Sequence, residues 1–249
     1  MRNTYILNPS DFTFIAFHDS RNELGRSGQL LLATGKPGTA SANMKLLVKH
    51  EYATDVPNEF VAGYIAGHLG FINPKVYLFR PCNRFQYAVG IEYMDRLEPC
   101  NLTELTDAQE VDLIHQVSLN ALVCQEDIMQ MNLWNGHVVS YDFANCFLLE
   151  GRNFPTSLSF MQNLLCNFAD HIMFAPDVAM RMMRKTNGAE RISRLYYDGL
   201  LPILELDEDY LLDILLDIFP ENIAGYYDAC VHEIKEQVKA ELSEKGYDR

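Results

Sequence analysis

Residues 127 to 142 read D-I-M-Q-M-N-L-W-N-G-H-V-V-S-Y-D, and this stretch indicates the fold more sharply than any other part of the chain. Two short apolar runs are joined by Asn135-Gly136, the dipeptide most favourable for the type I′ turn of a β-hairpin. Asp127 and Asn132 stand five positions apart, and Asp142 follows the second run. The stretch therefore predicts a hairpin that gathers two carboxylates and an amide.

The order of these polar residues is typical of phosphoryl transfer. Asp127 and Asn132 have the spacing of the D-x-x-x-x-N catalytic loop of protein kinases, in which a further aspartate follows downstream. In such a site the three groups orient the attacking hydroxyl and hold two Mg²⁺ ions, one of which bridges the ATP phosphates. Each residue alone is also an ordinary turn or capping residue. Their occurrence together, after a long predicted helix, favours the kinase-like interpretation.

The first part of the chain predicts a small β-rich lobe. Short runs of β-forming residues, each bounded by Gly, Pro or Asn, predict an antiparallel sheet of about five strands. The clearest runs lie at residues 30–32, 45–49, 76–79 and 87–93. One helix is expected to interrupt the sheet, because residues 58–69 carry apolar side chains at helical spacing and Gly70 follows as a stop signal.

The remainder of the chain predicts a larger helical lobe. Residues 107–124 repeat apolar side chains every three or four positions and are expected to form one long helix. Further helices are predicted at residues 158–175, 177–185, 189–198, 207–218 and 222–246. The predicted fold class is therefore α+β and two-lobed, like a protein kinase. Residues 1–95 would form the β lobe and residues 96–249 the helical lobe, with the join near residues 94–101.

A lysine at a predicted strand end and a glutamate at the start of the predicted helix form a second candidate pair. In kinases such a lysine, here Lys49, contacts the ATP phosphates, and a helix glutamate, here Glu59, holds it in position. Alternatively, Lys49 is a solvated strand-end residue and Glu59 an acidic residue favoured by the helix dipole. Lys45 competes with Lys49 for the ATP contact, since strand alternation puts both on one face.

Residues 34–41 form a loop of mostly small residues between two β-type runs. Such residues allow backbone N–H groups to approach phosphates closely. The segment matches neither a Walker A sequence nor the glycine-rich loop of kinases, and a plain hairpin loop explains it equally well.

Composition excludes several other classes of protein. The formal net charge of −14 disfavours direct binding to nucleic-acid phosphates. Six cysteines without a C-x-x-C pair give no zinc or redox signature. No apolar run has the length of a membrane span, and the N-terminus lacks the apolar region of a signal peptide. We therefore expect a cytoplasmic protein with reduced thiols that does not bind membranes, while secretion without a cleaved signal stays open.

The order of these motifs resembles that of the HipA-like serine/threonine kinases, known from bacterial toxin–antitoxin systems. The resemblance is carried by residues 41–49, residues 58–62 with 69–71, residues 127–132, and Tyr141-Asp142. The family has an S-G-x-Q-x-K segment, an N-E-x-x-A helix, a catalytic loop and an aromatic-Asp metal motif in these places. The chain resembles a compact member without the extra N-terminal subdomain of full-length toxins. Met129 departs from the family, which usually has histidine two residues after the catalytic aspartate.

The resemblance implies a role for each matching residue. Asp127 would be the catalytic base, Lys49 with its partner Glu59 would bind ATP, and Asn132 and Asp142 would hold Mg²⁺. The backbone of the hinge-like strand would receive the adenine, through Ile91, Glu92, Tyr93 and Met94. Ser41 and Thr39 would be the candidates for autophosphorylation in the nucleotide loop. The expected partners are a protein substrate, such as a translation factor, and an antitoxin.

Two alternatives remain on the sequence alone. The first is a small-molecule or lipid kinase, since the same fold resembles phosphatidylinositol and aminoglycoside kinases. The second is a non-catalytic pseudokinase module whose acidic surface binds a basic partner.

Overall fold

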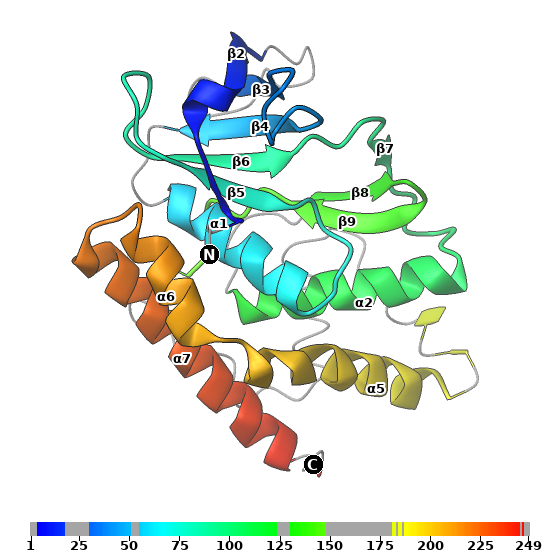
Figure 1. Cartoon of the computed structure of the whole chain (residues 1–249). Helices are drawn as coiled ribbons and strands as arrows, with labels where there is room; N and C mark the ends of the chain where they lie inside the picture. Colours follow the sequence, from blue (N-terminus) through cyan, green and yellow to red (C-terminus); the bar gives the residue numbers. More distant parts are fainter. Residues whose placement is uncertain are drawn as a thin grey trace.

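The computed structural model describes residues 4–17, 30–50, 55–123, 130–147, 181–182, 184–185, 187–244 and 246 (Figure 1). Asp127 and Met129 therefore lie outside the described residues, as do the predicted helix at 158–175 and most of the one at 177–185.

Six strands form the main sheet in the order β1-β5-β6-β4-β3-β2. Their bounds are β1 Ile6–Leu7, β2 Phe12–Ala16, β3 Leu31–Gly35, β4 Lys45–His50, β5 Val76–Phe79 and β6 Ala88–Glu92. Every neighbouring pair is antiparallel except β1 with β5, which is parallel. The sheet is thus mixed and has one strand more than the sequence predicts, because β1 is only two residues long and carries no alternation that could reveal it.

Helix α1, Asp55–His68, packs against β5 and β6 beneath the sheet (Figure 1). It begins three residues before the predicted start at 58 and includes Pro57, which is tolerated in a first turn because no helical acceptor is needed for its missing N–H. Gly63 lies so close to Val76 that a Cβ atom there would overlap the valine side chain. The close approach fixes α1, and therefore Glu59, at a defined distance from the strands.

The predicted hairpin is confirmed. β8, Gln130–Trp134, pairs antiparallel with β9, His137–Tyr141, and Trp134 faces His137 across a two-residue turn. Asn135 and Gly136 have φ values of 52° and 85°, as a type I′ turn requires. A short strand β7, Glu98–Pro99, adds a third member to this sheet.

The helices of the second half are α2 Asp107–Leu122, α5 Gly188–Leu200, α6 Glu208–Leu216 and α7 Glu221–Glu244. They confirm the helices predicted at 107–124, 189–198, 207–218 and 222–246, with ends shifted by one or two residues. Figure 1 shows α2 and α5 lying below the sheet, and α7 running diagonally at the side of the molecule away from the sheet. The main hydrophobic core joins all of these helices to α1 and the hairpin. The α+β fold class is confirmed, and the division at residues 94–101 stays a prediction.

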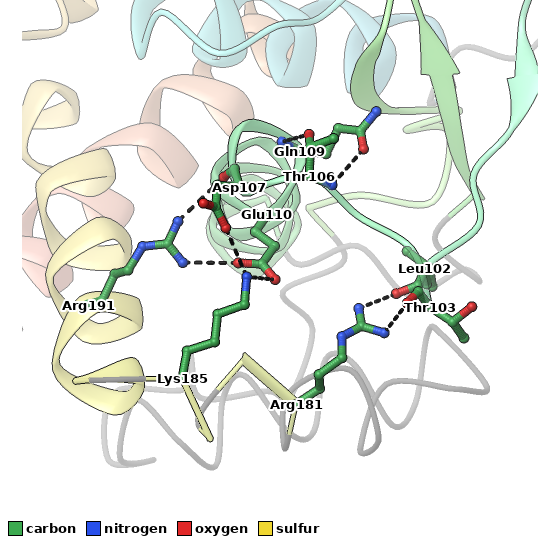
Figure 2. Close-up of polar contacts among 9 residues, drawn as sticks. All are labelled: Leu102, Thr103, Thr106, Asp107, Gln109, Glu110, Arg181, Lys185 and Arg191. Atoms are coloured by element: carbon green, nitrogen blue, oxygen red, sulfur yellow. Dashed lines mark hydrogen bonds and ion pairs between the residues drawn. The ribbon is translucent and has the colours of Figure 1, made fainter.

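An ion-pair cluster around the buried Glu110 fixes the start of α2 (Figure 2). Thr106 and Gln109 form a capping box, in which each side chain receives the other's backbone N–H. One turn in, Glu110 is 1% exposed and accepts from Lys185 at 2.8 Å and from Arg191 at 3.0 Å. Arg181 donates to the carbonyls of Leu102 and Thr103. The described residues between 181 and 191 are thereby tied to α2 and to the loop before it.

Candidate active site

Lys49, Glu59 and Asp142 come together although they are far apart in the sequence. Lys49 lies in the central strand β4, and its Nζ forms ion pairs with Glu59 of α1 and, at 2.6 Å, with Oδ1 of Asp142 just after β9. The side chains of Lys49 and Glu59 are 16% and 2% exposed, whereas that of Asp142 is 45% exposed. The arrangement is a nearly buried ammonium group with one buried and one accessible carboxylate.

The charges of the three groups depend on one another. Burial alone would lower the pKa of Lys49, but attraction to Glu59 and Asp142 outweighs it and holds that pKa above its ordinary value. Burial raises the pKa of Glu59, although Lys49 and the backbone N–H of Phe143 oppose the change. The pKa of Asp142 would also rise on burial, yet its contact with Lys49 leaves it lower than usual. Lys49 is therefore a permanent cation at neutral pH.

The backbone of Asp142 is in the left-handed region, with φ of 72°. This conformation is unfavourable for a residue with a Cβ atom, by about 1–2 kcal/mol, and is tolerated best by Asn and Asp. It turns the chain sharply as β9 ends. Phe143, the next residue, is buried. The surrounding structure thus holds a strained residue with its carboxylate against Lys49, which is typical of functional positions.

A buried polar network holds β9 in place. Gln116 and Asn120 of α2 are 0% and 2% exposed, although they lie on the otherwise apolar face of the helix. Gln116 accepts hydrogen bonds from the backbone and the hydroxyl of Ser140, at 3.2 and 2.7 Å, and donates to Asn73. Asn120 donates to the Ser140 hydroxyl at 3.2 Å. The sequence did not single out these two positions. The only signal that it offers is a pair of amide residues spaced four apart on the apolar face of the predicted helix.

Lys45, the alternative lysine, has different neighbours. Its Nζ lies 3.9 Å from the centre of the Tyr93 ring and 3.3 Å from Asp95, and its side chain is 43% exposed. Of the two lysines, the structure therefore brings only Lys49 into contact with both Glu59 and Asp142.

Asn132 lies farther along the hairpin than the sequence analysis expects. It pairs with Val139, three residues before Asp142, and its amide nitrogen donates to the Tyr141 hydroxyl at 3.2 Å. Within the described ranges, no group of three or more His, Cys, Asp and Glu side chains could hold a metal ion. The metal-binding roles of Asn132 and Asp142, and the catalytic role of Asp127, stay predictions.

The expected adenine contacts and phosphorylation sites lie on either side of β4. Ile91 and Glu92 belong to β6, and Tyr93 and Met94 follow it; the N–H groups of Glu92 and Tyr93 donate to the carbonyls of Lys75 and Lys45. The loop from 35 to 44 is a chain of tight turns. Ser41 is buried there and Thr39 is half-buried, with its hydroxyl donating to the Lys36 carbonyl at 2.8 Å.

The strand lysine, the helix glutamate and the aspartate after a hairpin, set in this α+β arrangement, are the pattern of a kinase-like fold. The comparisons agree at the level of the fold: the structure is similar to that of a Helicobacter pylori proinflammatory kinase, CtkA, with a TM-score of 0.56 over 88% of this chain and 91% of that chain, at 13% sequence identity. The expected HipA-like kinase fold is thereby confirmed.

A second solved structure to which this chain is similar is that of the Shewanella oneidensis toxin–antitoxin system of HipA, HipB and its operator DNA. It aligns with a TM-score of 0.49 over 91% of this chain and 67% of that chain, at 14% identity. No family model matches the sequence, and no curated protein matches it either. In the part of the chain that the structure describes, no helix is long and apolar enough to cross a membrane.

Proposed function

We propose that this chain is an ATP- and Mg²⁺-dependent serine/threonine protein kinase. The observation that carries the proposal is Lys49, held between the buried Glu59 and the accessible Asp142 in a fold similar to that of a solved bacterial kinase. A permanently charged ammonium group in a fixed position is suited to neutralise charge on phosphate oxygens. A solvated strand-end lysine, the alternative interpretation of Lys49, would not be enclosed by two carboxylates.

The described residues fit a bound Mg–ATP in part. Mg²⁺ at kinase sites is commonly held by one or two carboxylates together with substrate phosphates, and it neutralises charge that develops on the phosphates. Asp142 offers a half-exposed carboxylate of lowered pKa, which stays ionised at neutral pH. When all three groups are ionised, Lys49, Glu59 and Asp142 carry one excess negative charge, which favours a cation beside Asp142.

The remaining roles follow from the sequence motifs. Asp127 would accept the proton of the acceptor hydroxyl, and Asn132 would supply a second Mg²⁺ ligand. The backbone from Ile91 to Met94, at the end of β6 and just after it, would receive the adenine. Asn132 pairs with Val139 in the hairpin, and its amide lies beside Tyr141, the residue before Asp142.

Autophosphorylation belongs to the same proposal. Ser41 is 4% exposed, so the loop from 35 to 44 would have to leave its place before this hydroxyl could react. Thr39 is the more accessible of the two candidates. A translation protein as substrate and an antitoxin as partner are proposed from the sequence motifs alone.

Incubation of the purified chain with ATP labelled on its γ-phosphate, with Mg²⁺ or with EDTA, tests the proposal. We expect Mg²⁺-dependent label on serine or threonine of the chain itself. Lys49→Met and Asp142→Asn should each reduce labelling by about 100-fold or more. Lys45→Met, a matched lysine in the same strand, should retain activity within about threefold.

The same experiment separates the alternatives. Transfer of label only to added small molecules or lipids would contradict the protein-kinase assignment and favour the small-molecule or lipid kinase. Absence of both transfer and Mg²⁺-dependent ATP binding would overturn phosphoryl transfer altogether and leave a non-catalytic interaction module.

A further inference from the structure

The loop that follows Asp142 is held by side chains from two distant helices. The carbonyl of Ala144 accepts a hydrogen bond from Nδ2 of Asn58 in α1 at 2.6 Å. The carbonyl of Phe147 accepts one from the hydroxyl of Tyr226 in α7. Phe147 is itself in the left-handed region, with φ of 57°, so two strained residues, Asp142 and Phe147, lie within six positions of each other. Such a loop needs external contacts to keep its conformation.

Asn58 is itself fixed from the other side. Its amide oxygen accepts a hydrogen bond from the hydroxyl of Tyr227 in α7, and the residue is 3% exposed. Both ends of the buried amide are therefore used, and its orientation is fixed because a flipped amide would set its oxygen against the carbonyl oxygen of Ala144. The Tyr227 ring also packs edge-on against Phe147, with ring centres 5.7 Å apart.

Asn58 directly precedes Glu59, the buried partner of Lys49. The first turns of α1 thus present one side chain to the lysine and the neighbouring one to the loop that carries Asp142. A displacement of Tyr227 would release Asn58, and release of Asn58 would remove one anchor of the loop, two residues after Asp142. No kinase-like role in the sequence analysis accounts for Asn58 or for the C-terminal helix.

We propose that Tyr227 and Asn58 form a positioning relay through which helix α7 keeps the Asp142 carboxylate against Lys49. The relay is a property of the folded chain, and its effect on turnover rests on the proposed kinase function. Tyr226 is a second, parallel anchor of the same loop. Tyr226 reaches the carbonyl of Phe147, and Tyr227 reaches Asn58 and the Phe147 ring, so we assign both to positioning of the loop.

The relay can be tested without assuming any activity, through the reactivity of Lys49. A short pulse of an amine-reactive acetylating reagent, followed by peptide mass spectrometry, measures the labelling rate of each lysine. Lys45, exposed in the same strand, is the internal reference. In the native chain Lys49 should label far more slowly than Lys45, because its amine is paired and its pKa is raised.

Three variants and one control complete the design. Tyr227→Phe removes only a hydroxyl and should raise the Lys49:Lys45 labelling ratio by about three- to tenfold, with turnover lowered by a similar factor and the KM for ATP changed by less than about twofold. Asn58→Ala should do the same, and the double variant should exceed the larger single effect by less than about twofold, since both changes interrupt one path. Tyr210→Phe in α6 removes the hydroxyl of an exposed tyrosine, 39% accessible, and should change neither readout.

The outcomes distinguish the relay from the kinase assignment. An unchanged labelling ratio in Tyr227→Phe, or an equal rise in Tyr210→Phe, overturns the relay whatever the chain catalyses. A raised ratio in Tyr227→Phe in a chain whose native form transfers no phosphate supports the relay and overturns the proposed function. A change in melting temperature alone, with ratio and turnover unchanged, shows a purely structural role and also overturns it.

Discussion

Strand β4 sets the position of Lys49. Its positive charge is stabilised by two carboxylates that come from other parts of the chain. Glu59 supplies a buried oxygen and Asp142 an accessible one, so the two acids are not equivalent. Loss of the buried acid leaves an ammonium group with one partner in a poorly hydrated place. Loss of the accessible acid leaves the buried pair intact and removes the group best placed to meet a ligand.

Glu59→Gln should therefore lower stability as well as activity. Removing one partner of a buried ion pair leaves a desolvated charge, and because Asp142 remains as a partner we expect a loss of about 2 kcal/mol in the free energy of unfolding. Urea denaturation followed by circular dichroism measures it. Glu190→Gln, at an exposed position in α5, is the control and should change stability by less than about 0.5 kcal/mol. Equal stability of the two variants would contradict the buried pair.

Asp142→Asn should reveal its effect on stability through pH. Folding lowers the pKa of Asp142 from its ordinary value of 3.8, so the ionised carboxylate stabilises the folded chain above that pH, and this contribution is lost as the pH falls through the lowered pKa. Because the side chain is 45% exposed, the difference between native and variant chains should stay under about 1 kcal/mol at pH 7.

Asparagine also tolerates the left-handed backbone, so the substitution changes charge without adding strain. The two stabilities, measured by urea denaturation between pH 7 and pH 3, should converge at the acid end. A difference that stays constant over this range would show that the carboxylate does not contribute through its charge.

The hairpin and the helices set the positions from which these side chains act. β9 delivers Asp142 because its register is fixed by a two-residue turn at one end and by Gln116 and Asn120 of α2 along its length. Since a shift of one residue would turn every side chain of the strand to the other face, the turn residues matter for the site as much as for the fold.

Gly136→Ala should weaken the hairpin. Gly136 has φ of 85°, which a residue with a Cβ atom adopts only with strain, so we expect a loss of about 1 kcal/mol in the free energy of unfolding. Gly225→Ala in α7 is the matched control of opposite sign: nothing lies within 4 Å of the new Cβ, and alanine in a helix interior should stabilise by about 0.5–1 kcal/mol. Thermal unfolding of both variants checks the two directions.

Glu110→Gln tests the ion-pair cluster that anchors α2. Glu110 is 1% exposed between Lys185 and Arg191, whose side chains are 40% and 33% exposed; because both cations stay in contact with water, we expect a destabilisation of only about 1 kcal/mol. Asp107→Asn removes a neighbouring carboxylate that also contacts Lys185 but is 83% exposed, and should cost clearly less than Glu110→Gln, because water screens the pair. Similar losses in both variants would mean that burial does not set the strength of this cluster.

Across the whole molecule, the features that could be predicted from the sequence are those with a local pattern of residues, such as turns, strands and helices. The hairpin turn at Asn135-Gly136, the strand of Lys49 and the helix of Glu59 each have a local signal, and the structure has all three. Asn58 and Tyr227 are 169 positions apart, and no period or spacing links them. The parallel pairing of β1 with β5 and the register that sets Asn132 opposite Val139 likewise depend on tertiary packing. Contacts between distant segments are therefore the part that only the structure reveals.

Binding of ATP should stabilise the whole molecule if Lys49 meets its phosphates. A ligand that binds only the folded state adds about 2.7 kcal/mol at a concentration of 100 times its Kd, which for a chain of this length raises Tm by about 5–10 °C. We expect such a shift with Mg²⁺ and ATP in the native chain and in Lys45→Met. It should be largely absent in Lys49→Met, whose folding in the absence of nucleotide is checked by circular dichroism.

EDTA should reduce the shift in the native chain, because a half-exposed Asp142 can contact the phosphates favourably only through a cation. A shift of equal size with EDTA would contradict the metal-dependent site around Asp142, and an equal shift in Lys49→Met would remove Lys49 from the nucleotide site. Loss of the shift in Lys45→Met alone would assign the ATP contact to the lysine beside Tyr93 and Asp95, and the ion pairs of Lys49 would then serve only to join the sheet, α1 and the hairpin.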